Sequence, residues 1–207
     1  MVGHHLTCNR TFKLTEQVCL QCASVALQAA GWKEWFCNPT AGPWKRIKIN
    51  GVPDSQLTRF GKKENRPDLI AYNKTHSLVL VIEAKDVLRK LVAPEQFSKT
   101  QGVFTSVRRR IRQLIRQYEV LQLPSARELK ILCGYLFPLQ EDSRFSTTLN
   151  GLRRMHQRSG SAAEHVLFVV QRKGNDLYVL FDSTGCSRTT GATLAKALGG
   201  LGKYDTR

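Results

Sequence analysis

The chain has 207 residues and a formal net charge of +16, from 32 lysines and arginines against 16 aspartates and glutamates. Its 42% hydrophobic content is typical of a folded protein and excludes a disordered basic tail. The longest apolar runs, residues 78–82 and 166–170, are too short to cross a bilayer, and no apolar segment follows Met1. We therefore expect one domain over residues 1–207, in a cytoplasmic protein with no membrane partner.

The basic excess is spread along the whole chain. Residues 1–100 carry a net charge of +7 and residues 101–207 carry +9, so the excess does not belong to a detachable arm. A folded body with this balance favours a polyanionic partner, and nucleic acid is the first candidate. Charge alone does not separate a nucleic-acid-binding module from an enzyme.

The first expected element is a helix over residues 15–30. Thr15 suits its N-cap and Gly31 its end, and five residues share one face at helical spacing: Val18, Cys22, Val25, Ala26 and Ala29. A loop rich in Pro, Gly and Trp follows at residues 31–44. We expect a strand at residues 45–49, a turn at Asn50-Gly51 and a polar connection over residues 52–66.

Two cysteines of this first helix form a CxxC pattern. The chain has six cysteines in all: Cys8, Cys19, Cys22, Cys37, Cys133 and Cys186. Structural zinc usually takes paired ligands from knuckle-like turns, whereas Cys19 and Cys22 fall inside a helical pattern. We expect no zinc site and no disulfides, and we interpret the thiols as small buried hydrophobic groups.

Residues 66–85 predict a strand, a short turn and a second strand. The second strand is almost continuously apolar, which is typical of a strand with both faces covered. Residues 86–102 lack a clear period and are expected to form a loop with at most a short helical turn. A long helix is predicted over residues 103–121, with an apolar stripe that includes Val107, Ile111, Leu114, Ile115 and Tyr118.

The remaining pattern alternates strands and helices. We expect strands at residues 128–137, 164–171 and 176–181, and helices at residues 145–158 and 193–198. The fold class is therefore α/β (α+β), with a mixed central sheet flanked by helices.

Three charged residues are expected to meet at one edge of this sheet. Asp68 begins the first strand of the 66–85 hairpin and Glu83 ends the second, so their carboxylates come together if the strands pair in antiparallel register. Lys85 lies two residues after Glu83 and shares its face. Two carboxylates and the main-chain carbonyl of Ala84 are the oxygen ligands that Mg²⁺ prefers.

Such a metal site has the equipment to hydrolyse a phosphodiester. A bound Mg²⁺ polarises a phosphate oxygen and lowers the pKa of a bound water. Lys85 would position or deprotonate that water, or offset charge on the phosphate. The alternative interpretation is an exposed aspartate after Pro67 and an ordinary Glu–Lys pair at a strand end.

The spacing of these residues resembles the signature of the PD-(D/E)XK nuclease superfamily. Pro67-Asp68 is followed, after fourteen residues, by Glu83-Ala84-Lys85. The resemblance covers residues 15–137 and implies a restriction-endonuclease-like core, with residues 138–207 adding recognition or dimerisation elements. It implies that Asp68 and Glu83 are metal ligands and that Lys85 is catalytic.

Two further positions are compared with that superfamily. Many members place an acid on the first core helix, and Glu16 is the candidate here, although a glutamate in a first helical turn also needs no metal to explain it. Some branches carry a Gln and a Tyr one turn apart on the later helix. Gln113 and Tyr118 are five residues apart, so this chain departs from that pattern and Tyr118 is expected in the core.

Basic side chains are the candidates for DNA contact. On the long helix these are Arg108, Arg109, Arg112 and Arg116, together with Arg110, and elsewhere they are Lys62, Lys63, Arg89 and Lys90. The helical arginines could instead be solvated or pair with acids of a neighbouring subunit. Residues 86–102 and 138–160 are the segments in which we expect base recognition.

The function favoured by the sequence is a Mg²⁺-dependent endodeoxyribonuclease, with Mn²⁺ as a possible substitute, acting on double-stranded DNA. A type II restriction endonuclease fits best, working as a homodimer or as one subunit of a heterodimer. The alternatives are a structure-specific nuclease that resolves junctions or acts in repair, a nuclease that acts on RNA, and a non-catalytic nucleic-acid-binding module.

Overall fold

The computed structural model describes residues 6–7, 13–37, 52–57, 66–118, 129–140, 143–159 and 163–204. The strands in these ranges are β1 (Leu6–Thr7), β2 (Lys33–Cys37), β3 (Leu69–Asn73), β4 (Leu78–Ala84), β5 (Lys130–Pro138), β6 (His165–Lys173), β7 (Asp176–Asp182) and β8 (Gly202–Lys203). The helices are α1 (Glu16–Ala29), α2 (Asp54–Leu57), α3 (Leu88–Leu91), α4 (Pro94–Tyr118), α5 (Phe145–Arg158) and α6 (Arg188–Ala197).

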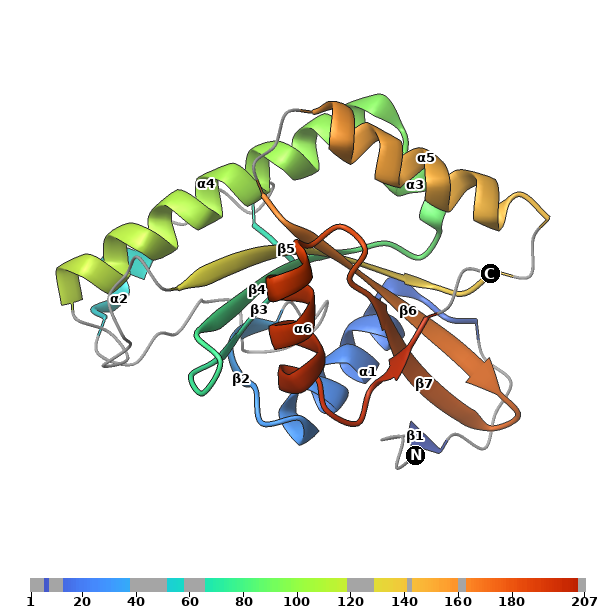
Figure 1. Cartoon of the computed structure of the whole chain (residues 1–207), viewed down its shortest axis with the longest axis horizontal. Helices are drawn as coiled ribbons and strands as arrows, with labels where there is room; N and C mark the ends of the chain where they lie inside the picture. Colours follow the sequence, from blue (N-terminus) through green and yellow to red (C-terminus); the bar gives the residue numbers. More distant parts are fainter. Residues whose placement is uncertain are drawn as a thin grey trace.

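One mixed sheet runs through the described part of the chain, in the order β1-β7-β6-β5-β4-β3-β2, with β8 beside β7. Strands β2, β3 and β4 are antiparallel, β4, β5 and β6 are parallel, and β7 is antiparallel to β6. Helices cover both faces (Figure 1), so the expected α/β class with a mixed, helix-flanked sheet is confirmed. Within the described ranges we find no helix with the length and apolarity needed to cross a membrane.

Each face of the sheet has its own hydrophobic cluster. Val79 and Val81 pack with α3, α4 and α5, whereas Leu80 and Ile82 pack with α1 and α6. Every residue of β4 is buried, as its continuous apolar sequence predicted. The central strand is thus held from both sides up to its last residue, Ala84.

Helix α1 begins as predicted, but its buried face is rotated. The Thr15 hydroxyl accepts a hydrogen bond from the Val18 amide, at 3.3 Å. Val25 was expected to be buried but is 43% exposed. Leu20 and Leu27 are buried instead, because they bring more apolar surface to the sheet and so determine which face of α1 packs on it. Cys19 and Cys22 are buried, and burial raises the pKa of their thiols to about 12 and about 11.

The prediction of a loop at residues 31–44 was wrong, because this segment contains β2, which pairs with β3. A register shift between Glu34 and Phe36 turns both Trp35 and Phe36 inward, which hides the alternation that normally marks a strand. The strand expected at residues 45–49 lies outside the described residues.

The segment at residues 86–102 was also predicted wrongly as a loop, because it contains α3 and the first turns of α4. Pro94 suits a first helical position, and Phe97, Thr100 and Phe104 are buried at spacings of three and four residues. The predicted start at residue 103 is therefore nine residues late. Val107, Ile111, Leu114 and Ile115 are buried and Tyr118 packs against the core, as expected.

The C-terminal elements agree with the sequence pattern to within a few residues. The exception is α6, which begins at Arg188 rather than near residue 193. Its start is fixed by Ser187, whose hydroxyl accepts a hydrogen bond from the Thr190 amide, at 3.3 Å. Gly174 takes a φ of 61° in the turn between β6 and β7, a conformation that favours glycine.

A buried histidine pair joins α5 to β6. The rings of His156 and His165 lie 3.8 Å apart between centroids, beside an ion pair of Arg153 and Asp182. Gly185 packs so closely on His165 that a Cβ atom there would lie 2.2 Å from the ring. Burial lowers the pKa of both histidines, to about 3 for His165.

We predict that this pair makes the fold sensitive to mild acid. The unfolded chain takes up protons on both histidines near their ordinary pKa of 6.5, whereas the folded chain takes them up only at lower pH, near 3 for His165. The free energy of unfolding should therefore fall as the pH drops below about 6.5, by up to about 1.4 kcal/mol per pH unit for each histidine. Urea titrations at pH 7.5, 6.5 and 5.5 measure this slope. A His165→Gln variant should show a shallower slope, and an unchanged slope would contradict this origin.

Candidate active site

The β3–β4 hairpin brings Asp68 and Glu83 together at one edge of the sheet. Leu69 pairs with Ile82, and the Asp68 amide donates to the Ile82 carbonyl at 2.9 Å, so Asp68 and Glu83 occupy facing positions. The Ala84 amide donates to Asp68 Oδ2 at 2.8 Å, which fixes the carboxylate against the end of β4. The proximity expected from the sequence is confirmed.

Lys85 lies at the centre of this group. Its Nζ is 2.8 Å from Glu83 Oε1, 3.9 Å from Asp68 Oδ2 and 3.8 Å from Glu16 Oε2. It also donates to the Ala84 carbonyl oxygen, at 2.6 Å. Three carboxylates and one carbonyl therefore surround one ammonium, and we call Glu16, Asp68, Glu83 and Lys85 the carboxylate cluster.

Glu16 is the member of the carboxylate cluster that comes from a helix rather than from the β3–β4 hairpin. It is the first residue of α1, directly after the Thr15 cap, so the start of the helix aims it at Lys85. This position agrees with both interpretations of Glu16, the first-turn charge and the neighbour of the site. Beyond it, Lys90 of α3 pairs with Asp86, with 2.7 Å between Nζ and Oδ1.

The carboxylate cluster is poorly solvated. Asp68 and Glu83 are 7% and 8% exposed. Burial and the charge of Asp68 raise the pKa of Glu83, Lys85 opposes both, and the balance sets this pKa at about 7. Burial also raises the pKa of Glu16. Burial disfavours the charged form of Lys85, but the surrounding carboxylates outweigh it and raise the lysine's pKa, so Lys85 is an ammonium at neutral pH.

The ligand atoms at this edge are all oxygens. They are the carboxylates of Asp68 and Glu83 and the carbonyl of Ala84, a set that suits a hard cation such as Mg²⁺ better than zinc. Over the described ranges, however, no three His, Cys, Asp or Glu side chains form a group that could hold a metal ion by themselves. A cation would need further ligands from water or from a substrate.

A groove of about 300 Å³ lies next to the carboxylate cluster, where β4, β5 and β6 end. It is lined by Lys13, Leu14, Asp86, Val87, Pro138, Leu139, Gln140 and Arg172. Five of these residues belong to the segments 86–102 and 138–160, in which we expected recognition. Lys13, Leu14 and Arg172 were missed. Arg172 could have been expected, because it lies near the end of β6 and the carboxyl ends of parallel strands share one edge of a sheet.

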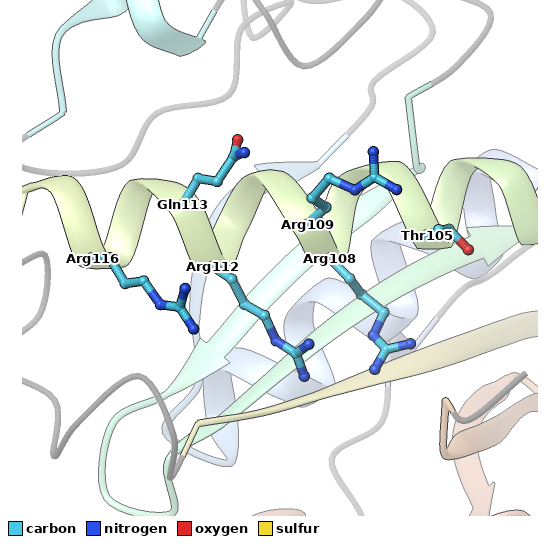
Figure 2. Close-up of a pocket in the computed structure, with 6 residues that line it drawn as sticks. All are labelled: Thr105, Arg108, Arg109, Arg112, Gln113 and Arg116. Atoms are coloured by element: carbon cyan, nitrogen blue, oxygen red, sulfur yellow. The ribbon is translucent and has the colours of Figure 1, made fainter.

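The arginines of α4 line a second, larger groove. It has a volume of about 560 Å³ and is lined by Thr105, Arg108, Arg109, Arg112, Gln113 and Arg116, which we call the arginine groove. Figure 2 shows Arg108, Arg112 and Arg116 extending from the same side of the helix. Arg110 does not belong to it, because its guanidinium donates to the carbonyl and side-chain oxygens of Gln56, both at 2.9 Å.

The predicted DNA contacts on α3 do not line this groove. Arg89 and Lys90 are exposed on α3, where Lys90 is paired with Asp86. Lys62 and Lys63 lie outside the described residues. Of the seven predicted basic residues that the structure describes, four therefore line one surface.

Comparisons of the chain with protein-family models, with curated proteins and with solved structures find no match. A function for this protein therefore has to be inferred from the carboxylate cluster and the two grooves.

We predict that Glu83 destabilises the fold at alkaline pH. Its folded pKa of about 7 lies above its ordinary value of 4.5, so the cost of ionising it grows from pH 4.5 to 7 and stays constant above. Glu83→Gln should raise the free energy of unfolding by about 1–3 kcal/mol at pH 8, and by much less at pH 5. Chemical unfolding at both pH values measures the difference.

The matched control is Glu95→Gln, which removes an exposed carboxylate from the first turn of α4. It should change the free energy of unfolding by no more than a few tenths of a kcal/mol, similarly at both pH values. A lower stability of Glu83→Gln at pH 8 would show that the contact with Lys85 outweighs the burial of the carboxylate.

Proposed function

We propose that the protein is a Mg²⁺-dependent endonuclease that hydrolyses phosphodiester bonds of double-stranded DNA at the carboxylate cluster. The observation that carries this proposal is the convergence of Asp68, Glu83 and Glu16 on the Lys85 ammonium, each within 4 Å. Charged groups are rarely buried at the end of an apolar strand without a chemical role. The net charge of +16 favours a polyanionic substrate.

The order of elements supports membership of the PD-(D/E)XK nuclease superfamily. Helix α1 is followed by three antiparallel strands, β2, β3 and β4, then by helix α4 and by β5, which is parallel to β4. This is the succession that the sequence resemblance implies for a restriction-endonuclease-like core. The motif residues lie where that core would need them, on the facing ends of β3 and β4.

In this proposal Asp68, Glu83 and the Ala84 carbonyl hold the metal. Bound Mg²⁺ supplies Lewis-acid chemistry, polarising a phosphate oxygen and making hydroxide available near neutral pH. The raised pKa of Lys85 favours the roles in which it positions the water or offsets charge over the role in which it deprotonates the water. A lysine that stays protonated offsets negative charge on the phosphate and cannot remove a proton from water. Glu16 keeps that ammonium turned toward the centre of the group.

A type II restriction endonuclease is the form of this activity that we favour. The residues after β5 add β6, β7 and β8 to the same sheet and pack α6 on one of its faces, which gives the chain surface for recognition and dimerisation beyond the catalytic elements. A two-fold dimer would place one carboxylate cluster on each strand of a duplex.

We predict metal-dependent cleavage that is lost with the carboxylate cluster. With Mg²⁺ and a long duplex of known sequence, the wild-type protein should give discrete fragments, and Asp68→Asn, Glu83→Gln and Lys85→Met should each slow cleavage by at least about 100-fold. Glu95→Gln and Lys99→Met, exposed on α4, are the charge-matched controls and should cleave normally. Gel analysis of time courses measures both groups.

The same experiment separates the competing functions. Cutting of a branched DNA in preference to the duplex would show that the protein is a structure-specific nuclease rather than a restriction endonuclease. Cutting of RNA but not DNA would show that its substrate is RNA. If no substrate is cut, and Glu83→Gln behaves as wild type throughout, the catalytic proposal is wrong.

We also predict that Mg²⁺ stabilises the folded protein. A cation that binds the carboxylates only in the folded state adds about 1.4 kcal/mol at ten times its dissociation constant. The melting temperature of wild type should therefore rise on titration with MgCl₂, and Mn²⁺ should act in the same way. Asp68→Asn should remove this increase while Glu95→Gln keeps it. An equal rise in both variants would mean that Mg²⁺ binds elsewhere.

A further inference from the structure

The arginine groove concentrates positive charge that no described residue lining it balances. Four of its six lining residues are arginines, and none of the described residues that line it is acidic. The Arg108 Nε atom is buried and has no hydrogen-bond partner among the described residues. Guanidinium groups repel one another when they gather in this way, so an anionic ligand with several charges would relieve the repulsion.

The spacing of Arg108, Arg112 and Arg116 along α4 fits the phosphates of one DNA strand. Arg108, Arg112 and Arg116 are four residues apart, or about 6 Å along the helix at 1.5 Å per residue. The row therefore spans about 12 Å, the length of three to four nucleotides of one DNA strand at about 3.4 Å each. Their side chains leave the helix on one side (Figure 2), and each guanidinium can contact a phosphate through two N–H groups.

The groove lies well away from the carboxylate cluster. Strands β4 and β5 are parallel, so α3 and α4 return the chain to the edge where β4 begins, and Lys130 at the start of β5 pairs with Leu78. The arginine-bearing end of α4 lies on the side of the β3–β4 turn (Figure 1). From Leu78 to Lys85 is seven residues of strand, or about 23 Å.

We propose that the arginine groove is an anchoring site for the phosphate backbone of duplex DNA, about 20 Å from the point of cleavage. This inference rests on the proposed nuclease function and adds a length requirement to it. A duplex of fewer than about ten base pairs fills either the groove or the carboxylate cluster, whereas a longer one fills both. Simultaneous contact makes the second binding event intramolecular and raises affinity for long DNA.

The test compares a 30-base-pair duplex with an 8-base-pair hairpin, both fluorescently labelled, by anisotropy in EDTA. Wild type should bind the long duplex at least about ten times more tightly than the hairpin. Arg112→Ala/Arg116→Ala should abolish most of that ratio and reduce the dependence of log Kd on log salt by about two. Both residues are exposed, so the double variant should keep the melting temperature of wild type.

The matched control is Arg154→Ala/Arg158→Ala, which removes the same charge from exposed positions of α5. It should keep the length ratio, by which we mean the affinity for the long duplex divided by that for the hairpin. This result would separate a local anchoring site from a general effect of net charge. If Arg112→Ala/Arg116→Ala and Arg154→Ala/Arg158→Ala have the same affinity as each other for the long duplex, and the same affinity as each other for the hairpin, the proposed anchoring site is wrong. It is also wrong if Arg112→Ala/Arg116→Ala keeps DNA affinity but dissociates an oligomer in light scattering.

These outcomes do not depend on cleavage. Loss of the length ratio in Arg112→Ala/Arg116→Ala, in a protein that cuts no DNA, supports the anchoring site and rejects the nuclease. Normal cleavage together with an unchanged length ratio in that variant rejects the anchoring site and leaves the nuclease standing.

Discussion

The antiparallel register of β3 and β4 is the constraint on which the rest of the site depends. Pairing of Leu69 with Ile82 sets Asp68 opposite Glu83, and a slip of one residue would send one of these side chains to the other face. The buried residues of β4 hold that register, because each of them is packed against helices on one face or the other. The hydrophobic core thus determines where the carboxylates stand.

Burial of the Asp68 and Glu83 carboxylates at this edge lowers the stability of the folded protein. Burial of the Glu83 carboxylate, and then its repulsion by Asp68, raise the pKa of Glu83, and Lys85 offsets these two effects only in part. A core built only for stability would carry apolar residues at these positions. The conflict between burial and charge is confined to the end of one hairpin, while the strands behind it obey ordinary packing rules.

The candidate site was more predictable from the sequence than the fold that carries it. Asp68, Glu83 and Lys85 belong to one hairpin, so local spacing was enough to bring them together. The β2 strand was missed because its bulge turns Trp35 and Phe36 to the same side, and the start of α4 because residues 94–102 show few apolar groups. The arginine groove depends on the direction in which α4 crosses the sheet, which follows from the parallel pairing of β4 and β5 rather than from any motif.

The carboxylate cluster comes from only one hairpin and the start of one helix, and this limits how much of the sequence its geometry depends on. Only the register of β3 and β4, the small Ala84 between the charged residues and the position of Glu16 need to persist for the carboxylate cluster to form. The rest of the sheet and its covering helices can drift, provided that they keep β4 buried. A chain built in this way can change at most of its positions while the carboxylate cluster keeps its geometry.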